Sequence, residues 1–417
     1  MRSQIDTLEA PDSPQPDPEW LRGRVHEWES AHLISHEQAT AILDREASHA
    51  GPADQSFRYR RLIAIVSTFG GILLGVGLLL LIGSNWADLP RVTKVLIAIA
   101  GVVTLEGVGY GLRFHTPYHR TGSTFLFIGS AAYGGAIFLV AQAYDYSLDD
   151  PNLFLLWFAP VMPMAYLLRS HAIAALGIAV GYGALGFRAA DWLDGAGGGL
   201  EDYGWQALYA VVGVAVAAIG YLHHRSEAMR PMGRPYQWIG SLTVLVLLYV
   251  MSFENWYEDG IDGWLGDVPG AMWLAIGVAV AVTVVAVVAL ATDGSDSARP
   301  ALAGLAVPAA AGYLLIGILL LGSSSTTVSF VLANLVLFAS LIGFVGVGIL
   351  TRQEALVNLS LAFFGLAVAS RYLEVGGGMF GTAVSMMLGG VLLIGLAWGL
   401  ERLRRSLLAR FELGGGP

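Results

Sequence analysis

Apolar runs alternate with short polar connections from residue 62 to residue 400. Each run is about twenty residues long, the length that a helix needs to cross the hydrocarbon core of a bilayer. The expected spans lie near residues 62–82, 92–112, 122–143, 152–168, 171–190, 205–223, 237–253, 270–291, 300–321, 327–350, 354–373 and 379–400. Because lipid offers no hydrogen-bond partners, such a chain must satisfy its backbone within helices. The pattern therefore predicts an all-α, polytopic transmembrane bundle of about twelve spans.

The segment before the first span has a different pattern. Residues 1–18 are acidic and proline-rich, which is typical of a disordered tail and does not fit a cleaved signal peptide. Residues 19–57 contain apolar positions at helical spacing, and Ser35 to Gln38 has the pattern of a capping box. We expect a small cytosolic helical hairpin here, which packs on the bundle, on the membrane surface or on a partner.

Charges predict the orientation of the bundle. Alternate connections carry most of the basic residues, namely Arg58, Arg60, Arg61, Arg113, Arg120, Arg169, Arg225, Arg230, Arg234, Arg299, Arg352, Arg402, Arg404 and Arg405. The intervening connections are mainly acidic. Basic connections normally face the cytoplasm, so both termini are expected there.

Composition narrows the classes of function. Hydrophobic residues make up 55% of the 417 residues and charged residues 13%, against about 25% charged in soluble domains. The absence of cysteine excludes disulfides, thiolate metal sites and cysteine nucleophiles. A net charge of −9 argues against a nucleic-acid partner. No cofactor, metal ion or catalytic residue is expected, and the sequence favours a non-enzymatic role.

A weak internal repeat divides the expected bundle. The first and seventh spans end in Asn-Trp pairs (Asn85 and Asn255), and the fifth and eleventh end in Arg-x-x-acid patterns that begin at Arg188 and Arg371. These matches predict a six-plus-six parallel duplication with halves at 58–234 and 235–405, followed by a cytosolic tail at 406–417. Because the motifs are short and tryptophan is common at membrane interfaces, chance similarity is the alternative.

Three further segments are distinctive: Leu33-Ile34-Ser35-His36-Glu37-Gln38-Ala39, Ser84-Asn85-Trp86-Ala87-Asp88-Leu89-Pro90-Arg91 and Gly134-Gly135-Ala136-Ile137-Phe138-Leu139-Val140-Ala141-Gln142-Ala143-Tyr144. Together they resemble one bacterial family, the domain-of-unknown-function 2157 family of predicted membrane proteins. The resemblance is best over residues 20–170. It implies a multi-pass protein of the bacterial inner membrane. It supplies no catalytic residue, because the family has no established activity.

Polar residues within or near the spans are the candidate binding residues, since such groups are costly at membrane depth. The substrate-binding candidates are Asn85, Trp86, Glu106, Gln142, Tyr144, Asp145, Arg188, Asp191, Asn255, Arg371 and Glu374. Glu106 lies inside a span, where it serves as a proton or cation site or forms a structural hydrogen bond to a small-residue interface. The others are expected near the outward face, where local i,i+3 ion pairs and an aromatic belt are the structural alternative.

Three hypotheses for function follow. The first is a secondary transporter or lipid-handling carrier, whose partners are membrane lipids and an unidentified small-molecule or lipid ligand. The second is a membrane scaffold or sensor that presents residues 19–50 to a cytosolic partner or to a second copy. The third is a membrane enzyme acting on a lipid-linked substrate. A water-filled cavity that reaches Glu106 would favour transport, a closed bundle the scaffold, and a lateral groove lipid handling.

Overall fold

The computed structural model is mainly helical over the residues that it describes. It describes residues 18–49, 89–194, 200–257, 268–295, 298–321, 326–351 and 353–379, together with residues 395, 398, 399 and 402. These ranges contain twelve α-helices and three short 3-10 helices, and no strand lies within them. The all-α class predicted from the sequence is confirmed. The chain separates into two compact units, residues 1–89 and residues 90–417.

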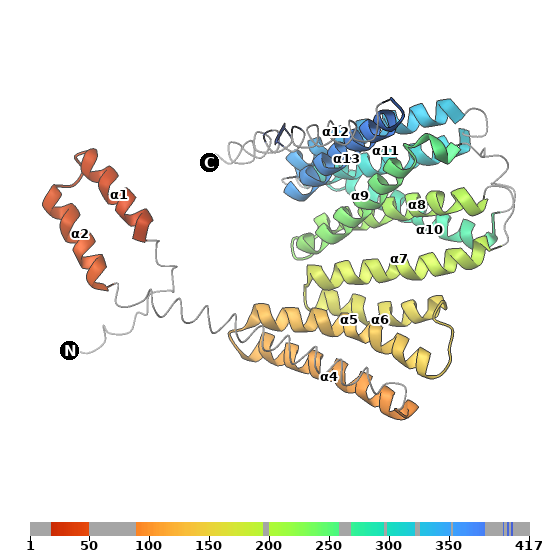
Figure 1. Cartoon of the computed structure of the whole chain (residues 1–417), viewed down its shortest axis with the longest axis horizontal. Coiled ribbons are helices and arrows are strands. Elements are labelled where there is room, and N and C mark those ends of the chain that lie inside the picture. Colours follow the sequence, from red (N-terminus) through yellow and green to blue (C-terminus); the bar gives the residue numbers. More distant parts are fainter. Residues whose placement is uncertain are drawn as a thin grey trace. The chain divides into compact units, whose positions relative to one another are not determined.

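The first unit contains a helical hairpin, α1 (Pro18–Ser30) and α2 (His36–His49) (Figure 1). The capping box is present with both of its bonds. The backbone N–H of Ser35 donates to Gln38 Oε1 at 2.9 Å, and the Gln38 N–H donates to Ser35 Oγ at 3.2 Å. Val25 and Ala39 are buried between the helices. The two short helices, and the capping box that begins the second of them, are therefore present as the sequence predicts.

Within its described residues, the second unit has ten long helices that run side by side (Figure 1). Their bounds are α4 (Arg91–His115), α5 (His119–Ala143), α6 (Pro151–Leu167), α7 (His171–Leu193), α8 (Leu200–Leu222), α9 (Gly233–Val250), α10 (Gly270–Ala291), α11 (Ala298–Leu321), α12 (Thr326–Leu350) and α13 (Glu354–Met379). The 3-10 helices are η1 (His223–Arg225), η2 (Arg230–Met232) and η3 (Glu254–Tyr257).

Each of these ten helices coincides with one expected span. Eight of the described helices are long and apolar enough to cross a membrane, and α6 is a shorter apolar helix. The span expected near residues 62–82, and all but a few residues of the span expected near 379–400, lie outside the described residues. A multi-pass helical bundle is therefore supported, whereas the count of twelve spans and the six-plus-six duplication stay predictions.

Helices α8 and α9 form the centre of the bundle. They pack on each other, α8 also contacts α10 and α11, and α9 also contacts α7 and α12. Their backbones approach closely at Gly240, where an added Cβ would lie 2.5 Å from Ala217 N and 2.5 Å from Gly213 O. Small residues thus permit a close contact between these two helices, as is usual in membrane bundles.

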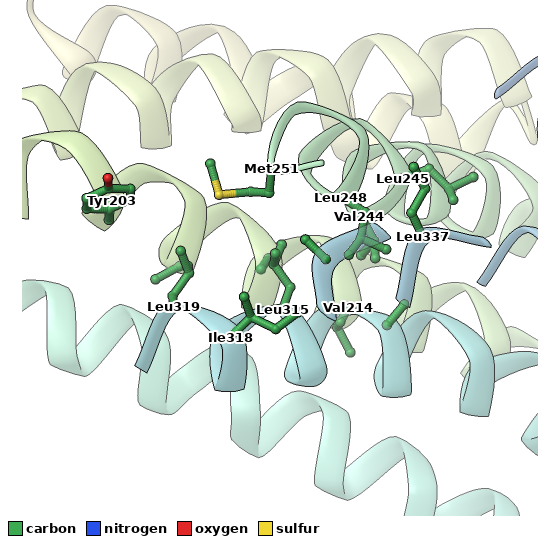
Figure 2. Packing of buried hydrophobic residues seen from close by; sticks show 14 of the residues in the cluster. Tyr203, Val214, Val244, Leu245, Leu248, Met251, Leu315, Ile318, Leu319 and Leu337 are labelled. Atoms are coloured by element: carbon green, nitrogen blue, oxygen red, sulfur yellow. The ribbon is translucent and has the colours of Figure 1, made fainter. Parts of the chain in front are cut away.

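Figure 2 shows the hydrophobic core around these two helices. Leu208 and Val214 of α8 pack with Leu245 and Leu248 of α9, and Leu315 of α11 closes the cluster. All five are almost fully buried. This core fixes α8, α9, α11 and α12 relative to one another.

The connections after α4, α6, α8, α10 and α12 meet at one end of the bundle. Arg113 donates to the carbonyl of Leu168 at 2.5 Å, Tyr166 Oη lies 3.1 Å from His223 Nε2, and Gln353 donates to Gln237 Oε1 at 2.8 Å. We call this the basic end, because it carries the arginine-rich connections. The opposite end, which contains residues 144–150 and 251–257, is called the acidic end. Which end faces the cytoplasm stays a prediction.

Candidate functional site

A groove of about 580 Å³ lies between α4, α5 and α6. Apart from three tyrosines, its lining is entirely aliphatic. The lining residues are Ala98, Ile99, Val102, Val103, Tyr133, Ala136, Ile137, Val140, Ala141, Tyr144, Tyr146, Leu153 and Leu156. The volume falls within the range of ligand pockets, and the lining suits a hydrocarbon chain.

The packing of α4 on α5 explains why the groove opens where it does. Toward the basic end the two helices touch closely: a Cβ on Gly109 would lie 2.8 Å from Leu126 N, and a Cβ on Gly122 would lie 2.7 Å from Arg113 Cα. The groove lies on the other side of these contacts, since its lining begins at Ala98 on α4 and reaches Tyr144 after α5. It therefore occupies the half of the α4–α5 pair that is nearer the acidic end.

Trp157 of α6 sets the spacing between α5 and α6. Its indole N–H donates to the carbonyl of Ser130 at 2.9 Å, and its ring packs directly on Gly134, where any side chain would overlap it. A large aromatic ring thus separates the two helices beside the groove. The hydrogen bond satisfies the polar atom of that ring, as buried indoles require.

Glu106 lines a second cavity, of about 280 Å³, next to the groove. Val102 and Tyr133 line both spaces, so the two adjoin. Ser130 Oγ lies 3.5 Å from Glu106 Oε1 but only 2.8 Å from the carbonyl of Leu126. A serine hydroxyl has one proton, and the shorter bond takes it. Within the described residues, the Glu106 carboxylate therefore lacks a strong hydrogen-bond donor and is available to a proton, a cation or a ligand.

An exposed ion pair lies at the acidic end of the groove. Arg91 Nη2, at the start of α4, lies 2.7 Å from Asp145 Oδ2, and the two side chains are 60% and 78% exposed. Asp145 has a φ of 55°, a left-handed conformation that aspartate tolerates and that terminates α5. Exposed pairs of this kind contribute about 0–1 kcal/mol, so a charged ligand can replace either partner at small cost.

Asp150 and Tyr146 order the connection that leads from the groove into α6. The Tyr146 hydroxyl donates to Asp150, and Asp150 Oδ1 accepts the Asn152 N–H at 2.8 Å, which caps α6. These hydrogen bonds hold the pKa of the Asp150 carboxyl below its ordinary value, and the bond from Tyr146 has the largest effect. The same contact raises the pKa of the Tyr146 phenol. Tyr146 is thereby held at the rim of the groove.

Arg188 lies in a different place, between α6 and α7. Its guanidinium is 3.5 Å from Asp191 on its own helix and 3.5 Å from the side-chain oxygen of Asn152. It also lines a separate pocket of about 320 Å³. The local i,i+3 pair that was the structural alternative is thus present. Whether Arg188 and Asp191 bind a ligand stays a prediction.

Arg371 belongs to a third group of contacts. It donates to the carbonyl of Ser252, and to Ser252 Oγ at 2.7 Å, and its guanidinium lies 4.3 Å from the centre of the Phe253 ring. Asn334 donates to the same carbonyl at 3.0 Å. These contacts hold the non-helical segment after α9 against α12 and α13. Their pattern is that of a structural clamp.

The eleven candidate residues are thus only partly brought together. Tyr144 and Asp145 lie at the groove, and Glu106 lies in the adjoining cavity. Gln142 is exposed at the end of α5, in the turn before them. Asn85 and Trp86 lie outside the described residues, as do the side chains of Asn255 and Glu374.

Sequence reasoning missed Arg91, Ser130, Tyr133 and Tyr146 as parts of this site. Ser130 and Tyr133 are three residues apart on one face of a largely apolar span, which is a signal that could have identified them. The aliphatic lining has no such signal. A groove-facing alanine or valine has the same identity as one that faces lipid.

The comparisons with known proteins agree with the membrane assignment. Residues 26–174 match the model of a family described as predicted membrane protein (DUF2157), which confirms the resemblance seen in the sequence. The matched range includes α4, α5 and α6, and therefore the whole groove. No curated protein and no solved structure matches the chain.

Proposed function

We propose that this protein handles lipids, and that it holds the acyl chain of an amphiphile in the groove between α4, α5 and α6. The observation that carries the proposal is the groove itself, whose volume of about 580 Å³ and aliphatic lining are those of a hydrocarbon site. A groove at the side of the bundle admits a ligand from the bilayer. A scaffold would need no such space.

The polar part of the amphiphile is placed at the acidic end of the groove. Arg91, Asp145 and Tyr146 present a cation, an anion and a phenol at this rim. Because the Arg91–Asp145 pair is exposed, a headgroup can replace one partner at a small cost in free energy. This arrangement accepts a charged or hydroxylated headgroup while the chain lies along α4 and α5.

The position of Glu106 supports transport of the amphiphile rather than permanent binding. A carboxylate in a span is costly, and residues of this kind usually bind protons or ions. In this proposal Glu106 takes up a proton or cation when the amphiphile occupies the adjoining groove. The expected consequence is that Glu106→Gln still binds an acyl chain but no longer couples its binding to proton or cation concentration.

The test is photo-crosslinking of the purified full chain with a long-chain fatty acid that carries a diazirine, followed by peptide mapping. The proposal predicts that adducts concentrate on peptides from α4, α5 and α6. Ala136→Trp fills the groove and should remove most of these adducts. Ala281→Trp, which adds the same side chain at an exposed position of α10, is the control and should leave them unchanged.

Adducts spread evenly over all lipid-facing helices would contradict the proposal. So would an Ala136→Trp variant that keeps its normal melting temperature and labels like the unmodified protein. A melting temperature matched to that of the Ala281→Trp control ensures that lost labelling reflects a filled groove rather than an unfolded bundle.

One observation favours the scaffold as a second candidate function. The α1–α2 hairpin belongs to a compact unit of its own, and Leu33 at its turn is 72% exposed. The exposed side chain of Leu33 is therefore the position at which we test this candidate. If the hairpin joins two copies, Leu33→Glu should lower the mass of the full chain measured by light scattering in detergent. An unchanged mass would count against this candidate.

A further inference from the structure

A cavity of about 590 Å³ lies at the basic end, at the first turns of α7, α9 and α13. It shares no residue with the groove between α4, α5 and α6. Its lining includes two residues of opposite charge, Arg234 at the start of α9 and Glu354 at the start of α13, together with His171 and Trp238.

The two charges do not neutralise each other. Arg234 and Glu354 are both exposed, and in the part of the chain that the structure describes neither side chain forms a hydrogen bond or an ion pair. Long, flexible side chains that line one cavity ordinarily pair when they can reach each other. The lining of this cavity therefore contains a cation and an anion that are not paired with each other.

We propose that this cavity binds the headgroup of a phospholipid that carries a primary ammonium. The phosphate lies against Arg234 and His171, and the ammonium lies against Glu354. Arginine is suited to phosphate because its planar fork of donors matches two phosphate oxygens. Basic pockets between spans are known to bind lipid headgroups in the same way.

The charges in the lining of the cavity distinguish between phospholipid headgroups. Arg234 and Glu354 contribute one positive and one negative charge to the lining, so the cavity offers a partner to each charge of a zwitterion. A purely anionic headgroup would place negative charge beside Glu354, and a choline headgroup has no N–H to donate to it. The phosphoethanolamine headgroup meets both requirements.

Trp238 supports a lipid rather than a free phosphate. Its ring lines the cavity and is 40% exposed, on the second turn of α9. Tryptophan at the end of a span prefers the level of the lipid headgroups, because its ring is apolar and its N–H is polar. Ala172 and Ala175 of α7 add apolar residues to the lining, which suit the glycerol backbone of a lipid.

Native mass spectrometry of the full chain, with equal amounts of phosphatidylethanolamine, phosphatidylglycerol and phosphatidylcholine of identical chains, tests the proposal. Phosphatidylethanolamine should bind about tenfold more tightly than phosphatidylcholine, which corresponds to about 1.4 kcal/mol. Arg234→Gln should weaken binding of all three lipids. Glu354→Gln should remove the preference for phosphatidylethanolamine and leave phosphatidylglycerol at least as well bound.

Arg230→Gln is the matched control, because Arg230 is an exposed arginine of the same connection that does not line the cavity. A loss of lipid from this variant equal to that from Arg234→Gln would overturn the proposal, since it would indicate general charge attraction. Equal binding of all three lipids to the unmodified protein would overturn it as well. Displacement of the lipid by millimolar inorganic phosphate would assign the cavity to free phosphate instead.

The Ala175→Trp variant is a second test of the proposed site, and it leaves both charges in place. It narrows the cavity and should lower binding of phosphatidylethanolamine, with the groove of the proposed function unaffected. Conversely, Ala136→Trp should leave this headgroup preference intact. The proposals for the two lipid sites can therefore be refuted independently of each other.

Discussion

The hydroxyl of Ser130 on α5 lies 3.5 Å from the carboxylate of Glu106 on α4, yet it directs its proton to the carbonyl of Leu126 at 2.8 Å. Glu106 is thus held beside a hydroxyl that offers its charge only a long, weak hydrogen bond. Such a carboxylate lowers the stability of the span that contains it. Reduced stability of this kind is common at functional sites.

From this relationship we predict that Glu106→Gln raises the stability of the bundle. Replacing a carboxylate that lacks a strong donor with a neutral amide should gain about 1–3 kcal/mol, the cost of a poorly satisfied polar group. The measurement is the melting temperature in detergent, with Glu227→Gln in an exposed connection as control. A lower melting temperature for Glu106→Gln would mean that the carboxylate is a structural partner.

A second prediction concerns the contact between α8 and α9. Gly240→Ala places a methyl group 2.5 Å from the Ala217 nitrogen and the Gly213 oxygen, both of which are backbone atoms that cannot move aside. We expect a loss of about 1–3 kcal/mol, as for overpacked cores. Gly277→Ala on α10 is the control, because its methyl group meets nothing within 4 Å. Equal melting temperatures for the two variants would refute the close approach.

A third prediction separates the two arginines with similar sequence patterns. Arg371→Ala removes charged hydrogen bonds to Ser252 and should cost about 1.5–3 kcal/mol. Arg188→Ala removes a partly exposed pair and should cost at most about 1 kcal/mol. Thermal shifts measured beside Arg120→Ala, an exposed control, should rank the three variants in that order. Equal shifts for Arg371→Ala and Arg120→Ala would argue against the clamp.

A fourth prediction follows from the depressed pKa of Asp150. Its folded-state pKa lies below the unfolded value of about 4, so its contribution to stability is complete above about pH 4 and is lost as the pH falls through the folded pKa. The difference in melting temperature between the unmodified protein and Asp150→Asn should therefore shrink on acidification. Asp149→Asn, in the same connection, is the control. A difference that stays constant with pH would rule out this linkage.

The helices could be predicted from the sequence because hydropathy acts on each segment alone. Ten expected spans coincide with described helices, since each apolar run ends at charged residues, proline or a cap such as Asp150. The hairpin was predictable for a similar reason. Its capping box is a local motif of four residues, from Ser35 to Gln38.

The site could be predicted only in part, because it depends on which helices meet. Arg188 and Arg371 share the pattern Arg-x-x-acid, but one is partly exposed beside Asn152 and the other reaches Ser252 across the bundle. The sequence identified Glu106 from its depth. It did not identify Ser130 as its neighbour, because the contact joins two helices, and the sequence of either helix alone does not say which helices pack together.

The most direct test of the central claim is a density map of the full chain in lipid nanodiscs. The account predicts elongated density along Val102, Ile137 and Leu156, with its polar end near Arg91 and Asp145. The Ala136→Trp variant should lack this density while the helices stay in place. A groove that is closed by protein side chains, or that is empty in the unmodified protein, would contradict the account.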